Sequence, residues 1–130
     1  ETIQTSPQVI IDTCHNIGGW EYIAKQLQRI IYENKKLHII FGVAADKEIS
    51  TILSLLPKNA FYYFTQASVK RSLPVQELMD KATPYISTAS AYTTVSQAYT
   101  AAIKHANAED VIFIGGSTFV VADLLKHIES

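Results

Sequence analysis

Val9-Ile10-Ile11-Asp12-Thr13-Cys14-His15-Asn16 is the stretch of sequence that decides the fold. Its three consecutive apolar residues indicate a short buried strand that ends at Asp12. From residue 17 to about residue 33, apolar residues recur at helical spacing with polar residues on the opposite face, which predicts an amphipathic helix. A buried strand that leads through a polar turn into such a helix is the repeating unit of parallel α/β sheets.

The same alternation continues to the end of the chain. Runs of apolar and aromatic residues predict four more strands, at residues 37–43, 60–65, 89–92 and 111–114. Helical patterns lie between them and after the last, at about residues 47–56, 75–82, 95–103 and 120–128. Ser72 is expected to cap the second of these helices, with Pro74 in its first turn, and Thr94 and Gln97 have capping-box spacing.

Five strand–helix units predict a single α/β domain over residues 1–130. We expect a Rossmann-like, doubly wound and mostly parallel sheet of five to six strands, with helices on both faces. Residues 2–4 are a candidate for the sixth strand, antiparallel to its neighbour. Right-handed crossovers then place the carboxyl ends of the parallel strands at one edge of the sheet.

Composition excludes several classes of function. The 130 residues are 48% hydrophobic and 18% charged, which is typical of a globular domain and argues against disorder. The net charge is −1 and the basic residues are scattered, so we expect neither nucleic acid nor an anionic membrane as a partner. No apolar run is long enough to span a bilayer.

Two features of the sequence concern its cellular context. Cys14 is the only cysteine, so no internal disulfide can form, and we expect a reducing, cytoplasmic location. The sequence begins at Glu1 and its only methionine is Met79. This favours the interpretation that the chain is a piece of a longer protein.

Polar residues collect where the predicted strands end, and ligands of open α/β sheets bind at that edge. Each strand but the fourth leads directly into such a group, and the groups are Asp12–Asn16, Asp46–Glu48, Gln66 with Lys70 and Arg71, and Gly115–Ser117. Their joint position is the evidence for a site, because each residue alone has an ordinary structural explanation as a loop, cap or surface residue.

These residues suit the recognition of hydroxyl groups and anions. Asp12 can accept hydrogen bonds from ribose hydroxyls, and His15 and Asn16 precede a helix whose N-terminus attracts phosphate. Lys47 and Arg71 can each neutralise a carboxylate or a phosphate.

The residues after the last strand allow two interpretations. Gly115 and Gly116 either let a ligand approach the backbone or permit a tight turn. Ser117 either offers its hydroxyl to a ligand or caps the last helix.

Together these motifs resemble the C-terminal domain of folylpolyglutamate synthases and of the related Mur ligases. Residues 12–16 are similar to the D-G-A-H-N motif of that family, and residues 42–48 resemble its G-x-x-x-D-K-D. Arg71, Pro74 and Leu78 fit R-x-x-P-x-x-x-L, and Gly116-Ser117 fits T-G-S. The matches occur in the family's order over nearly the whole chain. Departures such as Cys14, Ile17, Glu48 and Gly115 remove no charged group.

The resemblance implies an ATP-dependent ligase that adds glutamate to the tail of a folate through an acyl phosphate. In that family the P-loop, the Mg²⁺ ligands and much of the folate site belong to an N-terminal domain. This sequence contains no G-x-x-x-x-G-K-[ST], so we expect the chain by itself to be inactive. The implied ligands are ATP with Mg²⁺, L-glutamate and folate, and the implied partner is the protein's own P-loop domain.

The resemblance also implies roles for individual residues. Asp12 would hold the ribose, while His15 and Asn16 would lie near the phosphates, with His15 and Lys47 as the catalytic candidates. Lys47 and Ser117 would bind the carboxylate of the incoming glutamate, helped by Arg71. All of these roles are electrostatic positioning, and no metal ligand is expected in this chain.

Three alternatives remain open. The chain could belong to another Mur-type amino-acid ligase, it could be a free-standing nucleotide-binding α/β module, or it could be an interaction domain. A dinucleotide-binding fold is disfavoured, because it needs G-x-G-x-x-G after the first strand, where this chain has Asp12–Asn16.

Overall fold

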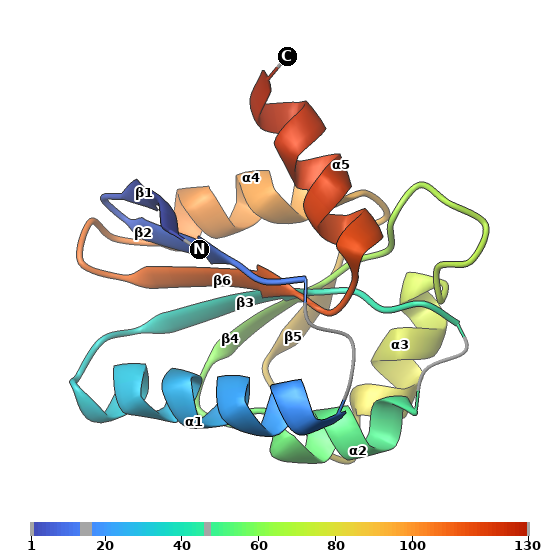
Figure 1. The fold of residues 1–130 in the computed structure, drawn as a ribbon, viewed down its shortest axis with the longest axis horizontal. Coiled ribbons are helices and arrows are strands. Elements are labelled where there is room, and N and C mark those ends of the chain that lie inside the picture. The colour runs from blue at the N-terminus through green and yellow to red at the C-terminus, as the bar shows by residue number, and fades with distance from the viewer. Residues whose placement is uncertain (1, 14–16, 46–47, 130) are drawn as a thin grey trace.

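The computed structural model describes residues 2–13, 17–45 and 48–129, which form one sheet and the helices that cover it (Figure 1). The strands are β1 (Thr2–Thr5), β2 (Gln8–Ile11), β3 (Leu37–Phe41), β4 (Phe61–Phe64), β5 (Ala89–Ala91) and β6 (Val111–Gly115). The helices are α1 (Ile17–Tyr32), α2 (Ile49–Leu55), α3 (Val75–Ala82), α4 (Val95–His105) and α5 (Thr118–Glu129). Of these helices, none is both long and apolar enough to cross a membrane.

The sheet has the strand order β1-β2-β6-β3-β4-β5. The five strands from β2 to β5 in this order pair in parallel, and β1 pairs antiparallel with β2. The predicted mostly parallel sheet is therefore confirmed, and so is the sixth strand at the N-terminal end. The predicted helix at residues 47–56 is shorter in the structure, where α2 begins at Ile49.

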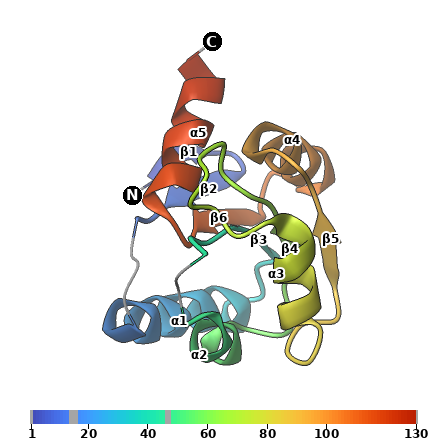
Figure 2. The ribbon, with the colours of Figure 1, turned by 90° about the vertical axis from the view of Figure 1, so that its right-hand side faces the viewer.

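Helices cover both faces of the sheet. Figures 1 and 2 show α1, α2 and α3 on one face and α4 and α5 on the other. Ile39 and Phe41 of β3 are buried among the helices of the first face, whereas Ile40 is buried on the second face. Because both faces are covered, β3 and β6 are buried along their whole length, which explains their continuous apolar sequences.

The path of the chain reverses at β6. After β2, the chain forms β3, β4 and β5 in order toward one edge, and it then returns through α4 to place β6 between β2 and β3. Such a reversal creates the crevice in which open α/β sheets bind ligands. The loops that follow β2, β6 and β3 are consequently neighbours at the carboxyl edge of the sheet.

The helix caps confirm one expectation and correct another. The hydroxyl of Thr94 accepts a hydrogen bond from the backbone N–H of Gln97 at 3.1 Å, as its capping-box spacing predicted. Ser72 does not cap α3. The backbone of Ser72 forms an isolated bridge with Ala44, and the first N–H of the helix, that of Val75, donates instead to Oε1 of Gln66 at 2.8 Å.

Gly116 fixes the turn that joins β6 to α5. Its φ of +105° is a backbone conformation that residues with a Cβ rarely adopt. A Cβ at this position would also overlap the carbonyl oxygen of Gly42, which follows β3. The turn after β6 therefore packs directly on the chain that leaves β3, and this contact needs a glycine.

We predict that Gly116→Ala lowers the free energy of unfolding by about 2–4 kcal/mol, because it combines backbone strain with a steric overlap. Urea denaturation of the purified chain measures the change. The control is Gly18→Ala, since Gly18 is exposed in the first turn of α1 and an alanine there is expected to be neutral or slightly stabilising. Equal unfolding midpoints for the two variants would contradict the packing argument.

Candidate functional site

Asp12 lies at the carboxyl edge, beside the end of β6. Its backbone N–H donates to the carbonyl oxygen of Ile114 at 3.1 Å, which extends the pairing of β2 with β6 by one residue. The residue is half-buried. His15 and Asn16, which sequence analysis places next to Asp12, lie outside the described residues.

The loops after β3 and β4 pair with each other across this edge. The N–H of Leu73 donates to the carbonyl oxygen of Val43 at 2.9 Å, and the N–H of Ala45 donates to that of Arg71 at 2.7 Å. Arg71 is thereby fixed beside the chain segment that leads to residue 46. Lys47, the other cation predicted for this site, lies outside the described residues.

The side chain of Arg71 extends over the first turn of α5. Its guanidinium carbon lies 5.9 Å from the centroid of the Phe119 ring, which is a cation–π contact worth about 0.5–1 kcal/mol at an exposed site. Within the described part of the chain, no carboxylate lies within salt-bridge distance of Arg71. Among the described residues, its charge is positioned by an aromatic ring and is not neutralised by an acid.

Ser117 caps α5 at the same place. Its hydroxyl oxygen accepts a hydrogen bond from the backbone N–H of Phe119 at 3.0 Å, and the residue is buried. The capping interpretation of Ser117 is therefore confirmed. Because Phe119 contacts Ser117 through its backbone and Arg71 through its ring, it ties the two predicted site residues to one helix N-terminus. That end of a helix carries partial positive charge.

The glycines of this edge serve packing. A Cβ on Gly115 would lie 2.9 Å from the ring of Phe113, and one on Gly116 would overlap the backbone of Gly42. The space beside these two glycines is therefore filled by the protein itself. The structure favours the tight-turn interpretation of Gly115-Gly116 over the close approach of a ligand.

Two buried polar atoms at this edge have no hydrogen-bond partner within the described residues. One is the hydroxyl of Thr65, which directly follows β4, and the other is the indole nitrogen of Trp20. Trp20 lies in the first turns of α1 and packs edge-on against Phe41, the last residue of β3. Since buried polar groups are nearly always paired, both atoms mark this edge as a place where polar contacts are incomplete.

Sequence reasoning missed the residues that hold the loop after β4. The side chain of Asp123 in α5 accepts hydrogen bonds from the backbone N–H of Ser68 at 2.8 Å and from its hydroxyl at 3.0 Å. Gln66 holds the other side of this loop through α3. The sequence shows that Phe119 and Asp123 lie one helical turn apart. It does not show their partners, because Ser68, the partner of Asp123, is 55 positions away.

The described residues contain no cluster of three or more His, Cys, Asp or Glu side chains that could hold a metal ion. What the described part of the edge offers is a carboxylate at Asp12, a cation at Arg71 and a helix N-terminus at Ser117. This arrangement can accept hydrogen bonds from hydroxyl groups on one side and bind an anion on the other.

Comparison with known proteins gives the family. Residues 1–118 match the model of the Mur ligase, glutamate ligase domain family. The chain is 24% identical over 127 residues to a dihydrofolate synthase/folylpolyglutamate synthase of Buchnera aphidicola subsp. Schizaphis graminum, and 25% identical over 131 residues to that of Escherichia coli K12. These alignments cover 97% and 100% of the chain, which spans 30% of the length of each relative.

Solved structures of such enzymes have the same fold. A bifunctional folylpolyglutamate synthase/dihydrofolate synthase of Yersinia pestis, complexed with AMPPNP and Mn, superposes with a TM-score of 0.84 at 21% identity. E. coli FolC in complex with DHPP and ADP gives a TM-score of 0.83 at 24% identity. A bifunctional enzyme with Mn, AMPPNP and L-glutamate bound gives 0.84 at 21%.

These three matches cover 99–100% of this chain and 30–31% of the solved chains. The match between the family model and most of the chain agrees with the motifs at the carboxyl edge, and the resemblance drawn from the sequence is confirmed. The chain belongs to the Mur ligase, glutamate ligase domain family, and its relatives are folylpolyglutamate/dihydrofolate synthases.

Proposed function

We propose that this chain is the C-terminal domain of an ATP-dependent ligase that adds glutamate to the tail of a folate. The observation that carries the proposal is the cation at Arg71, which has no acidic partner among the described residues and lies beside the capped N-terminus of α5, an arrangement suited to a carboxylate. Family membership and the names of the relatives support the same conclusion. We place the enzyme in the cytoplasm.

The proposal requires a second domain. The chain spans 30% of its relatives and contains no P-loop motif, so ATP phosphates and Mg²⁺ would be held mainly by an N-terminal P-loop domain. Solved structures of similar enzymes carry ADP or AMPPNP, which supports ATP as a ligand here. On this chain Asp12 fits the role of accepting hydrogen bonds from the ribose. His15 and Asn16 would face the phosphates.

Glutamate is the ligand that best fits the rest of the edge. Arg71 and Ser117 lie around one helix N-terminus, and Lys47 follows the segment that is paired with Arg71. A carboxylate placed there would meet the guanidinium and the partial charge of the helix. A similar enzyme was solved with L-glutamate bound, which supports this choice of amino acid.

The proposed reaction uses these residues as positioning groups. ATP supplies a phosphoryl group to the terminal carboxylate of the folate tail and so gives an acyl phosphate. The amine of the incoming glutamate then attacks the acyl carbon, the amide bond forms and phosphate leaves. His15 and Lys47 would stabilise the negative charge that develops, while Arg71 and the α5 N-terminus that Ser117 caps would hold the amino acid. Closure of this domain over the nucleotide would exclude water, which otherwise hydrolyses the acyl phosphate.

The alternatives differ in their substrates. Another Mur-type ligase would use the same nucleotide and amino-acid edge with a different acceptor, whereas a free-standing nucleotide-binding module or an interaction domain would catalyse no ligation. The glutamate ligase family favours an amino-acid ligase over the last two. The identity of the acceptor substrate decides between a folate ligase and another Mur-type ligase.

The first test is release of ADP by the full-length protein that carries this chain. We predict that ADP forms only when a folate and L-glutamate are both present, and that the 130-residue chain alone is inactive. A coupled spectrophotometric assay with each substrate omitted in turn measures this dependence. ADP release that needs a different acceptor would support another Mur-type ligase, and the absence of any ligation would contradict the proposal.

Arg71→Met tests the glutamate site. Loss of a charge-assisted hydrogen bond costs about 1.5–3 kcal/mol, which corresponds to roughly a 10- to 150-fold rise in KM for glutamate. We expect little change in KM for ATP and a loss of at most about 1 kcal/mol in the free energy of unfolding, because Arg71 is exposed and gives up only its contact with Phe119. Lys70→Met is the matched control, since Lys70 is an exposed cation on the same loop. If the two variants changed KM for glutamate equally, Arg71 would not be part of the proposed glutamate site.

Asp12→Ala, His15→Ala and Lys47→Ala test the remaining residues. Each substitution is predicted to reduce turnover of the full-length enzyme without unfolding it, because each removes a polar group that would contact the nucleotide or the amino acid. Steady-state kinetics and a thermal melt of each variant separate these effects. Full activity in all three variants would refute the proposal that the carboxyl edge of the sheet binds the nucleotide and the amino acid.

A further inference from the structure

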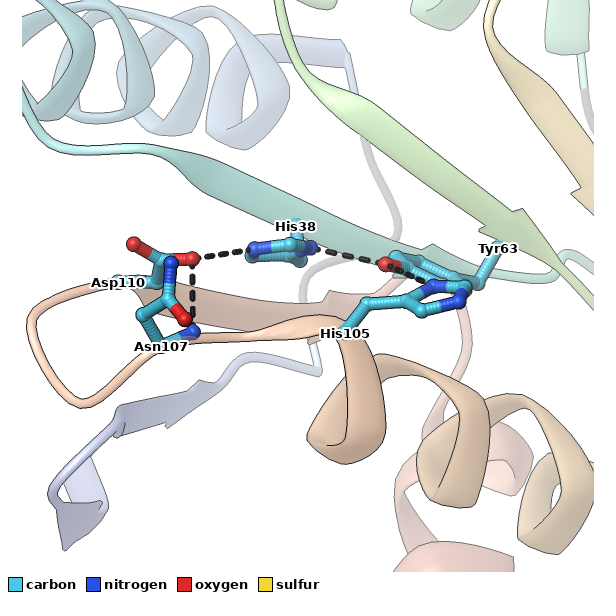
Figure 3. A network of polar contacts seen from close by, with 5 residues as sticks. All are labelled: His38, Tyr63, His105, Asn107 and Asp110. Atoms are coloured by element: carbon cyan, nitrogen blue, oxygen red, sulfur yellow. Dashed lines mark hydrogen bonds and ion pairs between the residues drawn. The ribbon is translucent and has the colours of Figure 1, made fainter.

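A second group of polar side chains lies at the opposite, amino edge of the sheet. His38 is the second residue of β3, Tyr63 belongs to β4, His105 ends α4, and Asp110 directly precedes β6. Figure 3 shows these four side chains in one line, which we call the amino-edge row. They are far from the carboxyl ends of the strands, so the ligase reaction proposed above does not use them.

Hydrogen bonds join the amino-edge row from end to end. Nε2 of His38 lies 2.9 Å from the Asp110 carboxylate, and Nδ1 of His38 lies 2.9 Å from the hydroxyl of Tyr63. That hydroxyl lies 3.2 Å from Nδ1 of His105 (Figure 3). His38, Tyr63 and Asp110 are buried, whereas His105 is exposed. The row therefore connects a buried imidazole, both of whose nitrogens are engaged, to an imidazole at the surface.

Asp110 fixes the direction of the hydrogen bond at the buried end. Burial tends to raise the pKa of Asp110, but the backbone N–H of Asn107, His38 and the charge of Lys36 outweigh burial and lower that pKa. The carboxylate therefore stays ionised at the pH values at which histidines titrate. An ionised carboxylate only accepts hydrogen bonds, so Nε2 of His38 carries a proton in every state of the row.

The hydroxyl of Tyr63 makes the rest of the row reversible. Burial, with smaller contributions from Tyr92 and Asp110, raises the pKa of Tyr63 to about 12, so the phenol keeps its single proton. Tyr63 can donate that proton to only one of the two imidazoles, and its oxygen then accepts from the other. The direction in which the hydroxyl points is therefore set by the protonation of the two histidines.

Two arrangements satisfy every hydrogen bond of the row. When His38 is neutral, its Nδ1 accepts from Tyr63, and the Tyr63 oxygen accepts from Nδ1 of His105. Nε2 of His105, the ring nitrogen outside the row, is then an acceptor. When His38 is protonated, its Nδ1 donates to Tyr63, the Tyr63 hydroxyl donates to Nδ1 of His105, and the proton of a neutral His105 lies on Nε2.

One added proton converts the first arrangement into the second. The proton binds Nε2 of His105, Nδ1 of His105 gives its proton to the Tyr63 oxygen, and Tyr63 gives its own proton to Nδ1 of His38. The phenol remains neutral, and the positive charge moves from the ring of His105 to that of His38. If both histidines were protonated, the Tyr63 proton would have no acceptor in the row. The row therefore holds one added proton.

The buried carboxylate determines which histidine holds the added proton. On His38 the positive charge lies 2.9 Å from the Asp110 carboxylate, and it completes a buried ion pair that would otherwise be one-sided. On His105 the charge lies at the exposed end of the row, without this contact. The other titratable or charged groups recorded around His38 are the exposed Lys36, Tyr63, the Tyr92 ring stacked on Tyr63, and His105.

We propose that the amino-edge row is a pH-sensitive proton relay, in which protonation of the buried His38 switches the tautomer of the exposed His105. The consequence appears at the surface. Nε2 of His105 offers a hydrogen-bond acceptor when His38 is neutral and a donor when His38 is protonated. The domain thus has a proton-dependent state at the edge of the sheet opposite the proposed ligase site.

Nitrogen-15 NMR of the imidazole rings in the isotopically labelled chain tests the relay, because protonated and bare ring nitrogens have widely separated shifts. Spectra are recorded from about pH 9 to about pH 5, a range that brackets the titration of histidine. At the alkaline end we expect protons on Nε2 of His38 and on Nδ1 of His105, the latter being the less common tautomer in water. As the pH falls, His38 should gain its second proton while His105 exchanges Nδ1–H for Nε2–H, with the same midpoint.

His127 is the internal control in the same spectra. It lies on α5, outside the row, where its Nδ1 is 2.6 Å from the hydroxyl of Ser96 and its ring packs on Tyr99. Its titration should not share the midpoint of His38 and His105. The proposal is overturned if His105 keeps one tautomer while His38 gains its second proton, or if His38 shows no change over the whole pH range.

Tyr63→Phe removes the hydroxyl and keeps the ring. We expect His105 to adopt the Nε2–H tautomer throughout and to titrate independently of His38. Tyr99→Phe is the matched control, since Tyr99 packs on His127 and lies outside the row, and it should leave the switch intact. An unchanged common midpoint in Tyr63→Phe would also overturn the proposal. If Tyr63→Phe does not fold, the titration of the unmodified chain decides.

Discussion

The parallel pairing of β6 with both β2 and β3 is the constraint on which the rest of the structure depends. Ile114 lies beside Ile11, and Gly115 lies beside Phe41, so three strands end together at one edge. The backbone contacts beyond the strands follow from this register. Asp12 bonds to Ile114, and Gly42 bonds to Gly115 at 3.4 Å. The turn at Gly116 then directs α5 back over the sheet. In the first turn of α5, the Phe119 ring contacts the guanidinium of Arg71, which comes from a neighbouring loop.

Much of this fold could be predicted from the sequence, because local patterns encode its elements. Apolar runs such as residues 111–114 identify strands that are buried on both faces, and Thr94 with Gln97 identifies a helix start. The site residues could be placed at one edge because the strands are parallel. The insertion of β6 between β2 and β3 was not predicted, since strand order depends on contacts between distant segments.

The errors and omissions also have a physical reason. Ser72 has the residue type and position of a helix cap, but its backbone pairs with Ala44, and Gln66 supplies the acceptor from another part of the loop. The contact of Arg71 with Phe119 joins residues that are remote in sequence. No rule about spacing reveals such a contact, although it determines where the guanidinium lies. For the same reason the row from Asp110 to His105 had no sequence signal, because it is assembled from two strands, a helix end and a loop.

The central claim is that nucleotide and glutamate meet this domain at the carboxyl edge of its sheet. The most direct measurement is amide hydrogen exchange of the full-length protein with and without AMPPNP and L-glutamate. Our account predicts that protection appears in residues 43–45, 71–73 and 116–119, while residues 107–111 at the amino edge exchange as before. Protection confined to the amino edge, or no protection anywhere in this domain, would contradict it.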